Sequence, residues 1–254
     1  MTTDHAPTLT IGIDLGGTSL RAASYSAQRG ILHSIVLRTR LEAGPMAVVE
    51  DMCQAVHDLM GRQSGDVEWF GIGVGSPGPL ELPAGRLHHP PNLPGWDGFP
   101  LLSELRKRLK QDVVLESDAN AAALAEFCLG LGKDLKVDSL CMLTLGTGVG
   151  NGIVLGGKLW HGSTGMGGEA GHMTVDRDGP VCGCGNQGCL EVCASATAVV
   201  NAAERQIETG SAVGLARLKE AKGTLTAFDI AEAVRGGDKD AAAAALAAAQ
   251  PELA

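Results

Sequence analysis

The sequence has few aromatic residues, no long apolar run and no long run of basic residues. Phe, Trp and Tyr together make up 3% of the 254 residues. No stretch reaches the roughly 18 apolar residues of a transmembrane helix, which argues against a chain that spans a membrane. The net charge is -9, from 20 Lys and Arg residues against 29 Asp and Glu residues. Nucleic acid and anionic membrane surfaces are therefore not expected partners.

The sequence also lacks a secretory signal and a disulfide framework. The N-terminus MTTDHAPT has no positive segment followed by an apolar one. The seven cysteines are an odd number. Three of them lie close together at 182, 184 and 189, and the other four are scattered in apolar surroundings. This usage predicts a reducing cytoplasm as the location.

Short apolar segments alternate with glycine-rich turns along the chain, which predicts an α/β protein of one large or two modest domains. The periodicity predicts strands over 9–14, 20–25, 31–39, 67–74, 113–116, 140–145, 153–155 and 158–160. It predicts helices over 45–63, 101–110, 121–129, 196–208, 215–222, 227–235 and 240–250. Thr226 is the expected N-cap of one helix, and Gly236-Gly237 its end. The alanine-rich last helix offers little apolar area for docking.

Two glycine-rich turns each follow a predicted strand. The first contains Asp14, Gly16, Gly17 and Thr18. Glycine lets the backbone approach a ligand, backbone N–H groups can bind phosphate oxygens, and an Asp at a strand end can hold Mg²⁺. A plain hairpin turn explains this motif equally well. The second turn, Gly146-Thr147-Gly148-Val149-Gly150, is another candidate phosphate cradle.

Asp118 lies where a predicted strand meets a predicted helix, in the sequence SDAN. Such an Asp is commonly an N-cap. It can also be a general base, and a domain boundary near Ser117–Asn120 would place it in a cleft. Asn92 lies in the proline-rich loop HHPPNLPGW, where it can contact a polar ligand above Trp96 or be a structural residue. The sequence indicates no role for His88 and His89.

The densest group of reactive side chains lies in residues 168–191, GEAGHMTVDRDGPVCGCGNQGCLE. One imidazole and three thiols form the ligand set of a closed tetrahedral zinc site: His172, Cys182, Cys184 and Cys189. Glu169 and Glu191 flank this set and are left free for another role.

These motifs, in this order, resemble the ROK family of sugar kinases, and most of all its bacterial glucokinase branch. IDLGGT, GSPGP, PPNLPGW, SDANAAALAE, LGTGVG, GEAGH and CGCGNQGCLE carry the resemblance over residues 9 to 195. It implies an α/β, two-domain actin/hexokinase-like (ribonuclease H-like) ATPase fold with its active site between the domains. The expected domains are a small N-terminal one, 1–117, and a larger one, 118–254, that carries the zinc motif. The second domain is expected to be truncated at its C-terminus, because no adenosine-holding turn or final helix follows Gln250.

The resemblance assigns roles to individual residues. Asp118 matches the catalytic base, and a structural zinc matches the cluster of His172 and the three cysteines. The sugar-binding positions are Asn92, Ser117, Asp118, Glu169, His172 and Glu191. The ATP and Mg²⁺ positions are Asp14, Gly16, Gly17, Thr18, Gly146, Thr147, Gly148 and Gly150. The sequence departs from the family at Ser117, where Asn is usual, and at Ser19, where Lys or Asn is common.

The expected activity is ATP-dependent phosphorylation of the 6-hydroxyl of a hexose, with PNLPGW favouring glucose. N-acetylmannosamine, N-acetylglucosamine, mannose and fructose are alternative acceptors, and polyphosphate is an alternative donor. A catalytically impaired sugar-binding remnant is a further alternative. A transcriptional repressor of the same family is not expected, since a first strand near residue 9 leaves no room for a preceding helix-turn-helix domain. The expected protein is a cytoplasmic homodimer.

Overall fold

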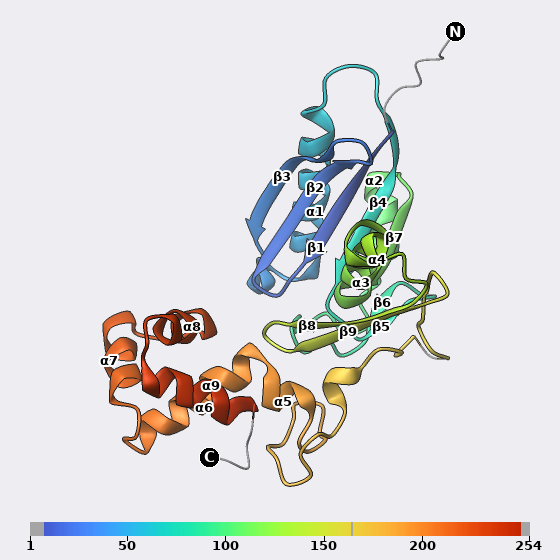
Figure 1. Cartoon of the computed structure of the whole chain (residues 1–254). Helices are drawn as coiled ribbons and strands as arrows, with labels where there is room; N and C mark the ends of the chain where they lie inside the picture. Colours follow the sequence, from blue (N-terminus) through green and yellow to red (C-terminus); the bar gives the residue numbers. More distant parts are fainter. Residues whose placement is uncertain (1–7, 164, 250–254) are drawn as a thin grey trace. The chain divides into compact units, whose positions relative to one another are not determined.

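The computed structural model describes residues 8–163 and 165–249 and divides the chain into two compact units (Figure 1). The first unit contains the residues up to Ser139 together with Val154–Gly167. The second contains Leu140–Ile153 and the residues from Gly168 onward. The alternation of strands and helices confirms the predicted α/β class.

A five-stranded sheet of order β3-β2-β1-β4-β7 forms the centre of the first unit. Strands β1 (Thr8–Leu15), β2 (Ser19–Ser26) and β3 (Gly30–Arg38) are antiparallel neighbours. Strands β4 (Glu68–Ser76) and β7 (Val113–Ser117) run parallel to β1. Helix α1 (Pro45–Gly61) connects β3 to β4, and α2 (Leu101–Leu109) precedes β7.

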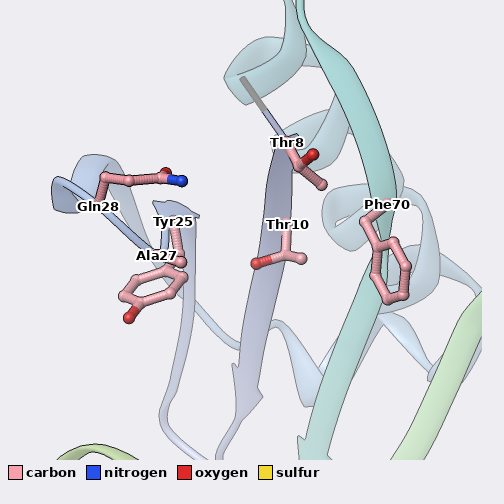
Figure 2. Close-up of a pocket in the computed structure, with 6 residues that line it drawn as sticks. All are labelled: Thr8, Thr10, Tyr25, Ala27, Gln28 and Phe70. Carbon is pink, nitrogen blue, oxygen red and sulfur yellow. The ribbon is translucent and has the colours of Figure 1, made fainter. Parts of the chain in front are cut away.

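One face of this sheet is covered and the other is open. Alternate residues of β1 point to opposite faces, and Ile11, Ile13 and Leu15 are buried in a core shared with α1 and α2. The open face carries a hollow of about 300 Å³ (Figure 2), lined by Thr8, Thr10, Tyr25, Ala27, Gln28 and Phe70. Its β1 residues belong to the first half of the strand. The hollow is therefore remote from Asp14, which lies near the other end of β1.

Shorter elements complete the first unit. They are η1 (Leu41–Ala43), β5 (Leu80–Glu81), β6 (Arg86–Leu87), α3 (Asp118–Leu129), α4 (Leu131–Leu135) and β10 (Lys158–Leu159), which pairs with the end of β9. Helix α3 contacts β4 and β7, so the compact unit continues past the predicted boundary between residues 117 and 118. The predicted domains, 1–117 and 118–254, stay a prediction.

The second unit contains β8 (Leu140–Leu145), most of β9 (Val149–Leu155) and a group of helices. These helices are η2 (Ala170–His172), α5 (Leu190–Ala194), α6 (Ala196–Glu208), α7 (Val213–Lys222), α8 (Ala227–Arg235) and α9 (Lys239–Ala249). Thr226 and Asp229 form a capping box at the start of α8, which confirms the predicted N-cap. Over residues 8–163 and 165–249, no helix has both the length and the apolar character needed to cross a bilayer.

The alanine-rich helix α9 docks against its neighbours, and the expectation of little docking area was wrong. Ala241 and Ala244 are fully buried, and Ala248 packs with Ala198 and Ala202 of α6. Small side chains let two helix backbones approach closely, so alanines bury area through proximity where larger residues bury it through size. Residue 250, the last of the predicted helix, lies outside the described residues.

Candidate active site and metal cluster

The carboxyl ends of β1, β4 and β7 meet at one edge of the first sheet because these strands are parallel. The register pairs Asp14 with Gly75 and Gly75 with Glu116. Asp118 follows β7 directly as the first residue of α3. A Cβ placed on Gly75 would lie 3.4 Å from the Cα of Asp118. The strand order therefore brings the two predicted carboxylates, Asp14 and Asp118, to the same edge.

Asp118 has the electrostatic environment of a general base. Loss of solvation raises the pKa of its carboxyl, the hydrogen bond from the Ala119 N–H opposes this, and the charge of Asp14 raises the pKa further. The Ala119 N–H lies 2.7 Å from Oδ1. A carboxylate with a raised pKa is a better proton acceptor near neutral pH. Interpreting Asp118 as an N-cap is wrong, because Ser117 occupies that position and its side chain makes no capping bond.

The first glycine-rich turn is both a hairpin and a point of close approach. The Gly16 N–H donates to the Ser19 carbonyl at 2.9 Å, so the turn itself uses the amide that was expected to meet phosphate. The Thr39 hydroxyl donates to the Gly16 carbonyl at 2.7 Å. A Cβ on Gly17 would lie 2.7 Å from the Asn92 carbonyl oxygen. Glycine at 17 therefore lets the Asn92 loop pack directly on the turn.

The loop that carries Asn92 is anchored by its apolar residues. Leu93 and Trp96 are fully buried in the main core of the first unit, and the Trp96 and Phe99 rings meet edge to face with centroids 5.2 Å apart. Asn92 itself is exposed. Burial of its neighbours thus holds the Asn92 side chain at the surface, beside Gly17.

Glu116 organises the start of α3, a role that no sequence motif predicted. One carboxylate oxygen accepts the Ser117 N–H at 2.9 Å and the Asn120 side-chain amide at 3.0 Å. The other lies 2.7 Å from Nε2 of His161. Asn120 is buried, and its Oδ1 has no hydrogen-bond partner among the described residues. His161 is far from Glu116 in the sequence, so no local motif identifies this pair.

The predicted metal ligands come together in the second unit. The ligand atoms of His172, Cys182, Cys184 and Cys189 all lie within 4.8 Å of one another. The distance is 3.7 Å from Cys182 Sγ to His172 Nδ1, and 3.7 Å from Cys184 Sγ to Cys189 Sγ. Two thiolates bound tetrahedrally at about 2.3 Å from zinc would be roughly 3.8 Å apart. These two distances fit a tetrahedral zinc ion.

His172 faces two groups with its two ring nitrogens. Nδ1 is directed at the cysteines, and Nε2 lies 3.9 Å from Oε2 of Glu169, whose side chain is exposed. Gly171, next to His172, is required by its packing, since a Cβ there would lie 2.0 Å from the Val149 carbonyl oxygen. Close contact with β9 thus fixes the position of the segment that presents Glu169 and His172.

Glu191 is engaged within the protein, and its predicted role in binding sugar stays a prediction. Its Oε2 accepts the Val149 N–H at 3.0 Å, and its Oε1 lies 3.9 Å from Cys182 Sγ. A Cβ on Gly148 would lie 2.2 Å from Oε2. Gly148 therefore admits Glu191, which links the second glycine-rich turn to the cysteine cluster.

The second glycine-rich turn is held against the first turn of α6. The Gly146 carbonyl accepts the Ala196 N–H at 2.9 Å, and the Thr147 carbonyl accepts the Thr197 hydroxyl at 2.7 Å. Gly150 belongs to β9. This turn is fixed by bonds to a helix N-terminus, where backbone N–H groups favour anions.

The structure thus gathers the predicted site residues into two groups, one in each compact unit. The first unit holds Asp14, Gly16, Gly17, Thr18, Asn92, Ser117 and Asp118. The second holds Gly146, Thr147, Gly148, Gly150, Glu169, His172, Cys182, Cys184, Cys189 and Glu191.

Comparison with known proteins gives consistent matches. A family model described as the ROK family matches residues 10–251. A glucokinase of Halalkalibacterium halodurans is 36% identical over 90% of this chain and 69% of its own length. A glucokinase of Thermotoga maritima is 39% identical over 74% of this chain and 58% of its own length. N-acetylmannosamine kinases occur among the further relatives.

A solved structure matches the fold at similar identity. It is a ROK family glucokinase from Streptomyces griseus in complex with glucose and AMPPNP, with a TM-score of 0.77 and 34% identity. The match covers 93% of this chain and 74% of that one. Against the two glucokinases found by sequence, the chain spans between 58% and 69% of the relative's length.

Proposed function

Because the chain belongs to the ROK family and has its actin/hexokinase-like α/β fold, we propose that it is an ATP-dependent hexose kinase. The reaction is transfer of the γ-phosphoryl group to the 6-hydroxyl of the sugar, and glucose is the preferred acceptor. The relatives named glucokinase and the solved structure that binds glucose with AMPPNP support this substrate pair.

The observation that carries the proposal is the place and environment of Asp118. A sugar hydroxyl is a poor nucleophile at neutral pH, and a positioned carboxylate can take its proton as the new O–P bond forms. Asp118 lies at the strand-end edge, loss of solvation raises its pKa, and Asp14 is its acidic neighbour. In the proposed step the proton of the 6-hydroxyl goes to Asp118, the bond from O6 to Pγ forms, and the bond from Pγ to the ADP oxygen breaks.

Binding of the nucleotide is assigned to the two glycine-rich turns. Phosphoryl transfer depends mainly on positioning and on neutralising charge. Asp14 would hold Mg²⁺, which neutralises phosphate charge when bound. Of the first turn, Gly17 and Thr18 are the residues whose amides we assign to phosphate, since Gly16 donates within the hairpin. The second turn, at the start of α6, contributes Gly146, Thr147, Gly148 and Gly150.

Recognition of the sugar is assigned to Asn92 and Ser117 in the first unit and to Glu169, His172 and Glu191 in the second. We assign a structural zinc to His172 and the three cysteines, whose spacing fits a tetrahedral ion. The zinc would fix the segment that carries Glu169, while the second ring nitrogen of His172 stays directed toward that residue. Glu191 Oε2 accepts the Val149 N–H, so we assign the other carboxylate oxygen, Oε1, to the sugar.

The proposed setting is the cytoplasm, where ATP is present and a reducing environment keeps zinc-binding thiols intact. A homodimer stays a prediction.

The test is an assay of sugar-phosphate formation with glucose, mannose, fructose, N-acetylglucosamine and N-acetylmannosamine, each with ATP or polyphosphate. We expect the highest kcat/KM with glucose and ATP, with the product identified as the 6-phosphate. Preference for N-acetylmannosamine would favour the second candidate, which kinases among the relatives support. Specific glucose binding with no phosphorylation of any acceptor would instead show a sugar-binding remnant. The absence of both phosphorylation and sugar binding would contradict the proposal.

A further inference from the structure

A second group of metal-ligand side chains lies at the surface of the first unit, apart from the cysteine cluster. His88, His89 and Asp97 are all exposed, and their ligand atoms lie within 4.8 Å of one another. None of them is used in the proposed reaction. Their grouping depends on how the backbone folds, since two neighbouring residues of an extended chain point their side chains to opposite sides.

The backbone at His89 removes that alternation. Its φ is 45°, in the left-handed region that side-chain-bearing residues seldom adopt. The His88 and His89 rings consequently meet edge to face, with centroids 4.6 Å apart. The His89 N–H donates to Oδ1 of Asp97 at 2.8 Å, which holds the unusual conformation in place.

The loop that joins these residues is closed at its base and fixed in its middle. The Leu87 N–H donates to the Phe99 carbonyl at 3.2 Å, and the Gly98 N–H donates to the Leu87 carbonyl at 2.9 Å. These bonds place His88 and His89 opposite Asp97. Leu93 and Trp96, which lie between His89 and Asp97 in the sequence, are fully buried. The three ligand side chains are therefore preorganised by backbone bonds and core packing.

The distance between His89 and Asp97 fits coordination of one ion. His89 Nδ1 lies 3.2 Å from Asp97 Oδ1. Two ligand atoms at about 2.1 Å from a metal, with an angle of roughly 90–110° between the bonds, are separated by about 3.0–3.4 Å. Imidazole and carboxylate together suit Ni²⁺, Cu²⁺, Co²⁺ or Zn²⁺, whereas Mg²⁺ prefers oxygen ligands alone.

We propose that His88, His89 and Asp97 form a surface site for a divalent transition-metal ion, with water in the remaining coordination positions. A simple ion pair between His89 and Asp97 is the plain alternative. That ion pair does not involve His88. Removal of the His88 side chain therefore distinguishes the metal site from the ion pair. Because the ligands lie at both ends of the loop, a bound ion cross-links residues 88 and 97.

The experiment is calorimetric titration of tag-free, zinc-replete protein with NiCl₂, with zinc content measured before and after. We expect one Ni²⁺ per chain in addition to the zinc, and a rise in melting temperature with Ni²⁺. His88→Ala, His89→Ala and Asp97→Asn should each weaken Ni²⁺ binding by about tenfold or more. Asp97→Asn keeps an oxygen that can accept the His89 N–H, so its loss of binding is not explained by loss of the loop conformation.

His57→Ala is the matched control, because His57 is an exposed histidine on α1 followed by an exposed Asp. It should bind Ni²⁺ as the natural chain does. The proposal is overturned if the zinc-replete natural chain binds no Ni²⁺, or if Ni²⁺ displaces zinc one for one. It is also overturned if the three ligand variants bind as tightly as His57→Ala. Circular dichroism identifies any variant that fails to fold.

Discussion

The two compact units fix their functional side chains by different means. In the first, Asp14, Glu116 and Asp118 lie at strand ends above a large aliphatic core formed by the sheet, α1 and α2. In the second, Glu169, His172 and the cysteines lie on a segment with little regular structure. Among the largest fully buried side chains of the described residues, only Leu215 and Ile230 belong to the second unit.

The cysteine-rich segment of the second unit, residues 168–191, is held by close backbone contacts and clustered ligands instead of core packing. Gly171 packs on β9, Gly148 admits Glu191, and three thiols surround one imidazole. A segment of this kind gains little from burial of apolar area. We therefore predict that the cysteine-rich segment depends on its metal, whereas the sheet of the first unit does not.

The largest expected effect follows removal of zinc. Structural zinc sites contribute about 10–16 kcal/mol of binding free energy in small metal-binding peptides. Chelation should therefore greatly increase hydrogen exchange over residues 168–194, while the five-stranded sheet keeps its protection. Cys184→Ser should lower the zinc content from about one per chain.

Cys128→Ser is the control for this substitution, because Cys128 is also exposed but lies on α3, outside the cluster. It should retain zinc. Equal zinc content in the two variants, or a protected segment in metal-free protein, would refute the structural role of zinc.

A smaller effect is expected when alanine replaces one of two glycines in the cysteine-rich segment. Gly171→Ala would bring a Cβ to 2.0 Å from the Val149 carbonyl oxygen, whereas Gly183 has no atom within 4 Å of the corresponding position. Neither residue has a left-handed φ. Gly171→Ala should destabilise the second unit by about 1–3 kcal/mol, and Gly183→Ala by less than about 0.5 kcal/mol. Hydrogen exchange in increasing urea measures both, and equal losses would count against the packing argument.

The smallest effect concerns Asp118 and pH. Its folded-state pKa is raised above the ordinary 3.8, so its contribution to stability is present at low pH and is lost as the pH rises through the folded-state pKa. Asp118→Asn, which stays neutral, should therefore be at least as stable as the natural chain near pH 7, with the difference decreasing toward about pH 4. Melting temperatures across this range test the sign, with Asp112→Asn, an exposed Asp just before β7, as control. A lower stability of Asp118→Asn at pH 7 that recovers at pH 4 would contradict it.

Local sequence patterns predicted most of the regular elements because their causes are local. The spacing of apolar residues in 45–63 corresponds to α1, and Thr226 and Gly236 mark the ends of α8 as expected. Gly156 and Gly157 both have positive φ between β9 and β10, as a two-residue hairpin requires. The grouping of His172 with the three cysteines was predicted from ligand chemistry and spacing alone.

The remaining features depend on residues far apart in sequence. Glu191 accepts the N–H of Val149, Glu116 pairs with His161, and Gly17 packs on Asn92. Periodicity carries no information about such pairs. The burial of alanines in α9 was missed for a related reason, since it depends on how closely α6 approaches.

The most direct test of the proposed division of labour compares Asp118→Asn with Glu169→Gln. Glucose affinity would be measured by calorimetry, and phosphorylation at saturating glucose and ATP by single-turnover quench. Asp118→Asn should bind glucose as the natural chain does, with phosphorylation slower by about 10²- to 10⁴-fold. Glu169→Gln should bind glucose more weakly and retain most of the rate at saturation. Near-normal turnover in Asp118→Asn, or the same pattern in both variants, would contradict the assignment of chemistry to the strand ends and of sugar recognition to the cysteine-rich segment.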